Sequence, residues 1–590
     1  MSTTELKSLL QTSLQPLLGE LARTQQRCVI VLQGPQQWQT QWLQHWQQQQ
    51  PFCAHIHSVE QSKNFRQWLG QNLQFVCVDW REQAVNYDVL AGMLGAINGG
   101  GALVLCLPPV ISHSIQHLIS TTMLGMILIT PDKSAADAVA PLLSYLSEQP
   151  DFTPTELPNQ AQTQWLQQVH QAPDGLQLLL ADRGRGKSTA LALAINQRLQ
   201  IDTELRVIIT APKRTQTDTL MRWLAPSERV RFVAWDKLQK TAPHPHEVLV
   251  IDEAAGLPTQ YLLELLHHRR VWLMATTIQG YEGCGRGFAV RMKSQLAQQY
   301  GAHISQFSTP VRFTPSDLLE QWLHHHLCLA EAQAPRFRAG RPLQLTFQHA
   351  SELSQPLLQQ VFQLLLAAHY QTAPNDLKRL LDDSQQHLAL AYCDNDLVGV
   401  AWLATEGQLD QDIAAQVVSG KRRLPGHLLP QQLSYVWQQP QLATLNYWRI
   451  VRIAVAQPYR RHRIGSQLIT AIIQQAQTAQ VDIVGSSFAR QSEVEAFWTA
   501  QQFQAVRYGL KVDAASGATS VIYLYPELVP SWRSYLEQQA QYAAAEQHWL
   551  VTGKLPSLSP RAAVLAAVEQ GILSPAQARL DLALAQQSHA

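Results

Sequence analysis

The chain lacks the features that mark a secreted, membrane-bound or disulfide-stabilised protein. Its seven cysteines are odd in number and dispersed, and no C-x-x-C spacing occurs, so we expect buried reduced thiols and no structural metal. The most apolar region, residues 102–130, is interrupted by Pro108, Pro109 and His113, which a lipid-facing helix would not readily tolerate. The first residues, MSTTELKSLL, lack a secretory signal pattern. We therefore expect a cytoplasmic protein with no membrane partner.

An excess of charge of one sign is also missing. The formal net charge is +1, which gives no global attraction for nucleic acid. Any RNA partner must then be held by local basic patches, and the candidates lie at residues 336–341, 421–423 and 460–463. A short basic run is usually a solvated loop, so each patch alone is weak evidence for RNA binding.

The length of 590 residues predicts several domains. Residues 1–148 alternate apolar strand-like runs with helical stretches, which predicts a small α/β domain with a mostly parallel sheet. We interpret the glycines at 99–101 as a turn, because they lack the G-x-G-x-x-G spacing. After a proline-marked linker, residues 149–335 show continuous apolar strands, which predict a second α/β domain whose sheet is covered on both faces.

The remaining chain predicts a third α/β domain and a helical tail. Residues 336–526 contain a hairpin-like stretch with Asp394 to Asp396 at its turn, the strand RIVRIAV and the helix IGSQLITAIIQQAQ. Residues 527–590 are rich in Ala, Gln and Leu, which favours helices. The sequence therefore predicts a multidomain α/β protein.

The stretch ADRGRGKSTA, which begins at Ala181, follows an apolar strand and precedes a helical pattern. Gly184 and Gly186 allow backbone N–H groups to converge on phosphate oxygens. Lys187 can reach the terminal phosphates of a nucleotide, and Ser188 can hold Mg²⁺. Alanine replaces the first glycine of the G-x-x-x-x-G-K-[ST] pattern, and we expect binding to survive if its backbone is ordinary. The alternative is a glycine-rich turn with a chance Lys-Ser pair.

A second element supports nucleotide hydrolysis. In EVLVIDEAAGLP, Asp252 can order Mg²⁺ and Glu253 can orient or deprotonate the attacking water. Thr276 or Thr277 could sense the γ-phosphate, and Arg286 could stabilise charge, although it could equally be an exposed loop arginine. Upstream glutamines could place one amide against an adenine edge, but this assignment is weak in a glutamine-rich chain.

The stretch RIAVAQPYRRHRIGSQLI indicates a different ligand. Its turn matches the Q/R-x-x-G-x-G/A pattern with which N-acetyltransferases bind the pyrophosphate of coenzyme A, with Arg460 first, Gly465 last and Arg463 in place of the middle glycine. The backbone of Ala454 and Val455 at the end of the preceding strand could meet the thioester. The alternative is a solvated helix cap.

With both motifs in one chain, the sequence resembles the bacterial tRNA(Met) cytidine acetyltransferase family, related to the eukaryotic RNA cytidine acetyltransferases. The stretches that carry the resemblance include RGRGKSTA, VLVIDEAAGLP, TTIQGYEGCGRGF, HYQTAPNDL, RRLPGHLLPQQL and RIVRIAV. It implies a RecA/helicase-like ATPase domain, a GNAT-type acetyltransferase domain and a tRNA-binding helical tail. The implied reaction is transfer of acetyl from acetyl-CoA to the wobble cytidine in the anticodon loop of elongator tRNA(Met), driven by hydrolysis of ATP or GTP with Mg²⁺.

The resemblance also implies site residues. Those implied to bind ATP are Gln160, Gln162, Ala181, Asp182, Arg183, Gly184, Arg185, Gly186, Lys187, Ser188, Thr189, Ala190, Asp252 and Arg286. Those implied to bind acetyl-CoA are Ile453, Ala454, Val455, Arg460, Arg461, His462, Arg463, Ile464, Gly465, Ser466 and Glu493. His369 and Tyr370 match a pair near the acceptor, and we take His369 as the candidate base, with a helix-face histidine as the alternative. Ala500 stands where the family has an arginine that contacts the cofactor.

Two rival functions remain open at this point. The first is an RNA-remodelling motor whose acetyltransferase domain is regulatory or acts on protein lysines. The second is a non-catalytic RNA-binding scaffold with a degraded acyl site, which the departures at Arg463 and Ala500 suggest. For any of these functions we expect a monomer.

Overall fold

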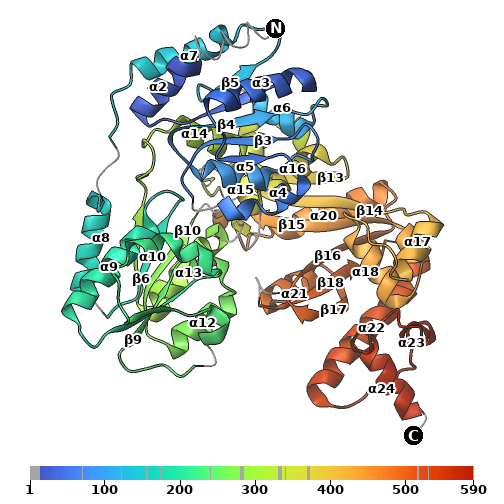
Figure 1. Cartoon of the computed structure of the whole chain (residues 1–590). Helices are drawn as coiled ribbons and strands as arrows, with labels where there is room; N and C mark the ends of the chain where they lie inside the picture. The colour runs from blue at the N-terminus through green and yellow to red at the C-terminus, as the bar shows by residue number, and fades with distance from the viewer. Residues whose placement is uncertain are drawn as a thin grey trace. The chain divides into compact units, whose positions relative to one another are not determined.

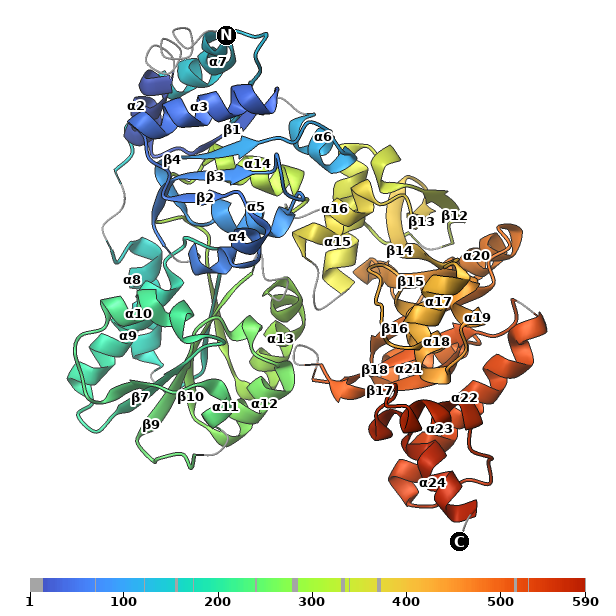
Figure 2. The same ribbon diagram turned by 45° about the vertical axis from the view of Figure 1, so that its right-hand side comes forward.

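The structure of the protein is a computed structural model (Figures 1 and 2). It describes residues 14–68, 71–120, 123–153, 157–172, 174–238, 241–278, 285–329, 335–338, 340–368, 373–513, 517–528 and 530–588. The chain forms two compact units, one of Met1–Ala332 with His369–Asp382 and the other of Gln333–Ala368 with Asp383–Ala590. Within the described residues, no helix is long and apolar enough to span a bilayer.

The first unit begins with a five-stranded parallel sheet in the order β2-β3-β4-β1-β5. Its strands are β1 (Cys28–Leu32), β2 (Ala54–Ile56), β3 (Leu73–Asp79), β4 (Ile97–Cys106) and β5 (Met126–Ile129). Its helices include α2 (Gln15–Thr24), α3 (Gln36–Gln49), α5 (Tyr87–Leu94), α6 (His113–Ile119) and α7 (Ala135–Ser147). Trp38, Trp42 and Trp46 lie one turn apart on α3 and are buried, so α3 packs by its tryptophan face despite its many glutamines. The parallel α/β domain predicted from the sequence is confirmed.

The three glycines at 99–101 lie inside β4, which corrects the prediction of a turn. Gly100 has a φ of +77°, and a side chain at Gly101 would place its Cβ 2.2 Å from the Gln74 carbonyl oxygen. The N–H of Gly99 donates to the carbonyl of Arg312 at 2.9 Å, and the N–H of Gly100 donates to that of Gln26 at 2.9 Å. The glycines therefore permit close approach of other backbone to this strand.

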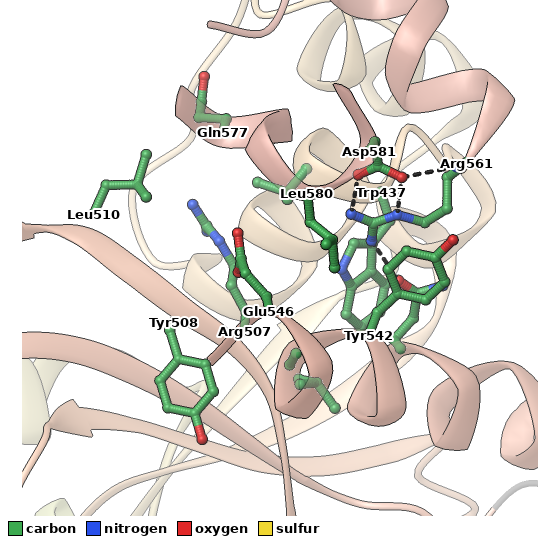
Figure 3. Close-up of a pocket in the computed structure, with 14 residues that line it drawn as sticks. Trp437, Arg507, Tyr508, Leu510, Tyr542, Glu546, Arg561, Gln577, Leu580 and Asp581 are labelled. Carbon is green, nitrogen blue, oxygen red and sulfur yellow. Dashed lines mark hydrogen bonds and ion pairs between the residues drawn. The ribbon is translucent and has the colours of Figure 1, made fainter. Parts of the chain in front are cut away.

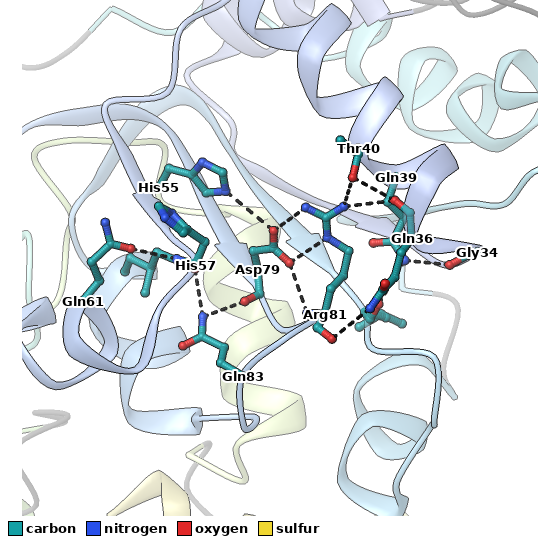
Figure 4. A network of polar contacts seen from close by, with 12 residues as sticks. Gly34, Gln36, Gln39, Thr40, His55, His57, Gln61, Asp79, Arg81 and Gln83 are labelled. Atoms are coloured by element: carbon teal, nitrogen blue, oxygen red, sulfur yellow. Dashed lines mark hydrogen bonds and ion pairs between the residues drawn. The ribbon is translucent and has the colours of Figure 1, made fainter.

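A polar network at the carboxyl end of β3 ties the sheet to α3 (Figure 4). The Arg81 guanidinium donates two bonds to Asp79, at 2.9 and 2.6 Å, and also donates to the hydroxyl of Thr40 at 2.5 Å. Burial of Asp79 opposes its ionisation, but His55 and Arg81 outweigh burial and lower its pKa. The acidic and guanidinium groups satisfy each other, so we interpret this network as structural.

The second sheet of the first unit has six parallel strands in the order β11-β6-β10-β9-β7-β8. They are β6 (Gln177–Ala181), β7 (Arg206–Thr210), β8 (Val230–Phe232), β9 (Glu247–Ile251), β10 (Val271–Thr277) and β11 (His303–Phe307). Its helices include α8 (Gln160–Gln171), α9 (Lys187–Ile201), α10 (Asp218–Trp223), α12 (Thr259–His268) and α13 (Gly285–Tyr300). Leu179 packs in a cluster with α9, whereas Leu178 packs in another with α12, so both faces are covered as predicted (Figure 2).

Two further helices complete the first unit. The helix α14 (Leu318–His326) contributes Leu318 to the core of the five-stranded sheet. The helix α16 (Pro374–Asp382) packs on α5 and α6, where the carboxylate of Asp382 accepts bonds from the Ser114 N–H and hydroxyl, both at 2.7 Å. Residues distant in sequence thus stabilise the N-terminal sheet.

The last residue of α14, His326, is fully buried, and its ring lies against those of His117 and His325. Burial lowers the pKa of His326 to about 3, and the two neighbouring histidines add to the effect. The unfolded chain keeps a pKa near 6.5, so protons bind the unfolded state first as the pH falls below that value. Stability is therefore lost between pH 6.5 and about 3, with a loss of about 2 kcal/mol at pH 5 from this group.

We expect the variant His326→Leu to lose less stability than the wild type when the pH falls from 7 to 5. The urea midpoint of the full chain at each pH measures the loss. His268→Leu is the matched control, because His268 is exposed on α12, and its midpoint should fall as the wild-type midpoint does. Equal falls in wild type and His326→Leu would show that the buried histidine is not a source of the acid sensitivity.

The second unit contains a seven-stranded sheet in the order β12-β13-β14-β15-β16-β18-β17. Its strands are β12 (Leu343–Gln348), β13 (Gln386–Cys393), β14 (Asp396–Gly407), β15 (Asn446–Val455), β16 (Ile483–Ala489), β17 (Gln504–Val512) and β18 (Thr519–Tyr525). All neighbours are antiparallel except β15 and β16, which are parallel. The predicted hairpin is confirmed, with Asp394 at its turn in the left-handed region (φ 54°).

Helices cover both faces of this sheet. They include α15 (Gln355–Ala368), α17 (Gln411–Val418), α18 (Leu428–Trp437), α19 (Gln441–Thr444), α20 (Ile464–Thr478) and α21 (Ser492–Ala500). Leu468 of α20 packs in one buried cluster and Leu433 of α18 in another. The tail is helical as predicted, with α22 (Pro530–Thr552), α23 (Ala562–Glu569) and α24 (Arg579–Ser588).

The cysteines that the structure describes are free, as predicted. Five of the six are buried, and Cys53 is exposed. Cys284 lies outside the described residues. Burial raises the pKa of Cys328 to about 12, so this thiol is protonated and unreactive at neutral pH.

Candidate functional site

The predicted phosphate loop lies between the end of β6 at Ala181 and the start of α9 at Lys187. Gly184 (φ 78°) and Gly186 (φ 80°) both adopt the left-handed conformation, which glycine takes without strain. Ala181 is an ordinary strand residue, paired with Thr277 of β10. The strand-loop-helix geometry is therefore complete without the first glycine of the pattern.

Lys187 lies where the carboxyl ends of three strands meet. Its ammonium group is 2.9 Å from the Thr277 hydroxyl and 3.7 Å from a carboxylate oxygen of Glu253. It also contacts the carbonyls of Ala181 and Asp182, each at 3.4 Å. The buried ammonium group therefore lies where the terminal phosphates of a nucleotide bound to this loop would lie.

Asp252 offers an oxygen that fits a magnesium ion. One carboxylate oxygen accepts the Glu253 N–H at 3.0 Å, whereas the other is buried without a partner among the described residues. Burial and the adjacent Glu253 charge raise the pKa of Asp252, and the Ser188 hydroxyl bonds to it and opposes that rise. No group of three or more His, Cys, Asp or Glu in the described chain could hold a metal. Nucleotide phosphates and water would complete the coordination.

Glu253 is held as an ionised carboxylate. Its backbone is left-handed (φ 51°), which turns it away from the end of β9. The Thr277 hydroxyl and N–H donate to its carboxylate at 2.8 and 3.1 Å. Burial opposes ionisation, but Lys187 and these bonds outweigh it and lower the pKa of Glu253. The other candidate sensor, Thr276, is fully buried and accepts the Ala255 N–H, so Thr277 is the threonine that lines the site.

Gln162 holds the phosphate loop, which corrects its assignment to an adenine edge. It is fully buried, and its amide oxygen accepts the Asn159 N–H at 2.9 Å. Its amide nitrogen donates to the Gly186 carbonyl at 3.0 Å. Because its side chain has no exposed surface and both ends of the amide are engaged, Gln162 does not line the cleft. Gln160 is exposed on the first turn of α8 and stays a candidate.

Other predicted contacts of the loop are made by backbone or by structural side chains. The Arg185 guanidinium donates to both carboxylate oxygens of Glu320, each at 2.9 Å, and so faces away from the nucleotide. Ala190 packs in the core, while Thr189 and Arg183 line the cleft over the loop. Asp182, which directly precedes Arg183, is half-buried.

Three predicted site residues cannot be placed. The backbone of Arg286 belongs to α13, but its side chain lies outside the described residues. His369 and Tyr370 also lie outside the described residues.

The structure adds Arg312, which sequence reasoning missed. It lines a cleft of ≈ 1240 Å³ together with Lys187, Glu253 and the glycines of the loop. Burial first, and then the charges of Arg183, Arg27 and Arg222, lower its pKa to about 10. No described carboxylate pairs with it. A half-buried arginine among other cations favours an anion such as phosphate. The sequence signal, an arginine soon after the last strand of a nucleotide-binding sheet, is weak.

The second candidate site lies in the seven-stranded sheet, where two parallel strands separate. The pairing of β15 with β16 runs from Tyr447 opposite Ile483 to Ile450 opposite Ser486 and then stops. Both strands continue beyond that point, β15 paired only with β14 and β16 paired only with β18. An extended acyl arm could therefore enter between them and bond to free backbone groups.

The direction of the backbone groups corrects one predicted contact. The N–H of Ala456 donates to the Val398 carbonyl of β14 at 2.9 Å. Because N–H groups alternate along a strand, that of Ala454 also faces β14, whereas those of Val455 and Ile453 face the opening. An oxyanion would thus be met by Val455 and Ile453, and not by Ala454.

The turn that follows β15 has the shape that the glycine pattern requires. Arg463, in place of the middle glycine, is left-handed (φ 60°), as is Arg461 (φ 65°), and α20 begins directly afterwards. Arg460 donates to the Val455 carbonyl at 3.2 Å. The exposed arginines and the helix N-terminus together create a positive field suited to a pyrophosphate.

Replacing Arg463 by glycine should relieve backbone strain. A non-glycine residue in the left-handed region costs about 1 kcal/mol, so we expect Arg463→Gly to raise the free energy of unfolding by about 0.5–1 kcal/mol. Urea unfolding without cofactor measures the change. Arg460→Gly is the control in the same turn, because Arg460 has a negative φ (−65°), and it should not stabilise. A destabilised Arg463→Gly variant would contradict the strain argument.

The remaining acyl-site residues surround this turn. A side chain at Gly465 would place its Cβ 3.3 Å from the ring of Phe497 on α21, so space there is limited. The His462 ring packs on Phe337, with ring centroids 4.5 Å apart. Ile464 is buried and can offer only backbone, whereas Ser466 is half-buried. The first-turn residue Glu493 and the last-turn residue Ala500 of α21 are both exposed.

Comparisons with known proteins identify the family of the chain and match the segments that carry the two sites. Family models match residues 3–124 (tRNA(Met) cytidine acetyltransferase TmcA, N-terminal), 178–330 (RNA cytidine acetyltransferase NAT10/TcmA, helicase domain) and 360–477 (GNAT acetyltransferase 2). A relative from Idiomarina loihiensis, described as tRNA(Met) cytidine acetyltransferase TmcA, is 32% identical over 503 residues, which cover 83% of this chain and 79% of the relative. A relative of the same description from Vibrio cholerae is 32% identical over 84% of this chain and 71% of its own.

Solved structures were also compared. A GNAT family acetyltransferase from Elizabethkingia anophelis with acetyl-CoA bound is 14% identical and covers 31% of this chain and 96% of that chain, with a TM-score of 0.21.

Proposed function

Because the chain belongs to the tRNA(Met) cytidine acetyltransferase TmcA family, we propose that it acetylates the N4 amine of the wobble cytidine of elongator tRNA(Met). Acetyl-CoA is the proposed donor, and ATP or GTP with Mg²⁺ is the proposed energy source. The observation that carries the proposal is that one chain contains both sites. A phosphate loop precedes α9, and an anion-binding turn precedes α20 beside the parallel strands β15 and β16, which separate there.

The acyl site suits attack of an amine on a thioester. A cytosine amine is a weak nucleophile, because its lone pair is delocalised into the ring, so alignment and proton removal must supply much of the acceleration. The amine nitrogen bonds to the carbonyl carbon, the carbon–sulfur bond breaks, and the thiolate leaves. The N–H groups of Val455 and Ile453 would stabilise the oxyanion. His369 stays the proposed base and Tyr370 its neighbour.

The nucleotide site suits hydrolysis of a nucleoside triphosphate. Lys187 and Arg312 would neutralise charge on the phosphates, and Glu253, held ionised by Thr277, would orient the attacking water. Ser188 and Asp252 would hold Mg²⁺, which supplies further charge neutralisation when bound. We assign Arg312 this role on geometry, while Arg286 stays a proposal from the family resemblance.

Hydrolysis has no chemical part in making an amide from a thioester. We therefore propose that nucleotide turnover remodels the anticodon loop, because a base must leave its stack before it can enter a pocket. The helical tail is the proposed tRNA-binding region. In the pocket between the tail and β17, Arg561 is paired with Asp581, and Arg507 of β17 lies apart from that pair (Figure 3). Arg507 donates to the side chain of Gln432. Burial lowers the pKa of Arg507 to about 10, although the nearby Glu546 charge opposes that shift. We propose that this arginine contacts an RNA phosphate.

The domain boundaries stay proposals: an N-terminal domain at 1–148, the ATPase domain at 149–335, the acetyltransferase domain at 336–526 and the tail at 527–590. The described residues 373–382 pack with the first unit, although they lie within the acetyltransferase segment of the sequence. A monomer that acts in the cytoplasm is the proposed state.

Purified protein mixed with acetyl-CoA, ATP and total tRNA tests the function. The RNA is digested to nucleosides, which are identified by mass spectrometry, and N4-acetylcytidine is the expected product. Its absence, together with steady nucleotide hydrolysis stimulated by RNA, would instead support a remodelling motor. Acetyl-CoA binding with neither activity would support a non-catalytic scaffold.

A further inference from the structure

Backbone and side-chain contacts join the N-terminal domain to the segment that carries Arg312. We call residues 311–320 the clamp segment. The N–H of Gly99 donates to the Arg312 carbonyl, and the N–H of Thr314 donates to the Gln25 carbonyl at 3.3 Å. The side chain of Gln26 accepts the Leu318 N–H at 2.9 Å. One edge of the clamp segment is thus held along its length by the N-terminal domain.

A buried ion pair strengthens the same contact. The guanidinium and N–H of Arg27 bond to the two carboxylate oxygens of Asp317, at 2.8 and 3.0 Å, and both side chains are almost fully buried. The Arg27 guanidinium also lies 3.6 Å from the ring centroid of Phe313. Breaking such a pair on one side leaves an uncompensated buried charge, so the arrangement is strongly specified.

The other edge of the clamp segment meets the phosphate loop. The N–H of Val311 donates to the Gly184 carbonyl at 2.9 Å. Glu320 accepts two bonds from the guanidinium of Arg185, which stands between the two glycines of the loop. A chain of direct contacts therefore runs from the N-terminal domain, through the clamp segment, to the loop that receives the nucleotide.

We propose that the N-terminal domain is a working part of the nucleotide-hydrolysing site, in which Gly99 and residues 25–27 position Arg312 through the clamp segment. This inference rests on the proposed nucleotide hydrolysis and on the role of Arg312 in it. Gly99 and Arg27 are positioning residues, since they act through Arg312 and the loop. Their effect should appear in kcat, because a displaced charge weakens stabilisation of the transition state more than ground-state binding.

Gly99→Ala tests the proposal, because a Cβ there would lie 2.9 Å from the Arg312 carbonyl and 2.5 Å from a side-chain atom of Gln25. We expect Arg312→Ala to lower kcat for ATP hydrolysis about 100-fold and Gly99→Ala to lower it about 10-fold. The double variant should be no worse than Arg312→Ala, because the two changes remove the same interaction. Gly19→Ala is the matched control in the same domain: nothing lies within 4 Å of its Cβ position, and kcat should be unchanged.

A second variant tests the same proposal in case Gly99→Ala does not fold. Arg27→Met with Asp317→Leu removes both buried charges together, which is tolerated better than removing one. This pair should also lower kcat with little change in KM and should show no further loss when combined with Arg312→Ala. Acetyl-CoA affinity of every variant should equal that of the wild type, which reports that the second unit is intact.

The outcomes distinguish the role of Arg312 in hydrolysis from its positioning by the N-terminal domain. If Arg312→Ala hydrolyses ATP at the wild-type rate, the proposed role of Arg312 fails and the inference falls with it. If Arg312→Ala is impaired but Gly99→Ala and the paired change keep full kcat, only the positioning inference is overturned. Losses that multiply in the double variants would also overturn it, since they would show independent effects.

Discussion

Lys187→Ala is expected to lower kcat for nucleotide hydrolysis about 100- to 1000-fold while leaving acetyl-CoA affinity unchanged. The Lys187 ammonium is buried at the strand ends, 3.7 Å from the Glu253 carboxylate and 2.9 Å from the Thr277 hydroxyl. Its charge is therefore fixed where terminal phosphates would lie, and preorganised charge of this kind is worth a few kcal/mol in the transition state. Phosphate release measures hydrolysis, and calorimetric titration measures acetyl-CoA binding.

The matched control for this prediction is Lys133→Ala, because Lys133 is exposed in the N-terminal domain. It should hydrolyse nucleotide at the wild-type rate. A Lys187→Ala variant that keeps hydrolysis would show that the loop is not the nucleotide site. Loss of acetyl-CoA binding in the same variant would contradict two separate sites.

Gly465→Trp is expected to weaken acetyl-CoA binding at least 100-fold, which is about 2.7 kcal/mol. The Cβ position of Gly465 already lies 3.3 Å from the Phe497 ring and 3.9 Å from a methyl of Val455. An indole has no room there, so it must displace either Phe497 or the turn that would hold the pyrophosphate. Equilibrium titration with acetyl-CoA measures the loss.

Thr470→Trp places the same indole on the exposed face of the same helix and should bind acetyl-CoA as the wild type does. Nucleotide hydrolysis should continue in both variants. Wild-type affinity in Gly465→Trp would place the acyl donor elsewhere in the protein.

The strands show which part of the fold the sequence could predict. Buried strands such as β7 and β9 were identified because both faces are covered, which produces continuous runs of Val, Ile and Leu. The strands β2, β11, β12 and β17 have no continuous run of this kind, and all four lie at the edge of their sheets. Edge strands bury less surface, so their sequences carry polar residues and a weaker apolar signal.

The site residues also divide into those that the sequence can predict and those that it cannot. The loop around Gly186 and the turn around Gly465 could be predicted, because the signal for each is local: a strand, glycine or arginine spacing, and a helix start. Gln162 and Arg312 could not be placed, since their roles depend on contacts that only folding creates. The glycines at 99–101 were misread for that reason: they allow the approach of the Arg312 carbonyl from a distant part of the chain.

Acetylation of tRNA with and without hydrolysable nucleotide tests the central claim most directly. Protein, labelled acetyl-CoA and tRNA are incubated with ATP, with a non-hydrolysable ATP analogue or with no nucleotide, and label in N4-acetylcytidine is counted for wild type and Lys187→Ala. We predict efficient transfer only for wild type with ATP. Equal transfer by Lys187→Ala, or by wild type without nucleotide, would contradict the claim that both phosphate-binding sites serve one reaction.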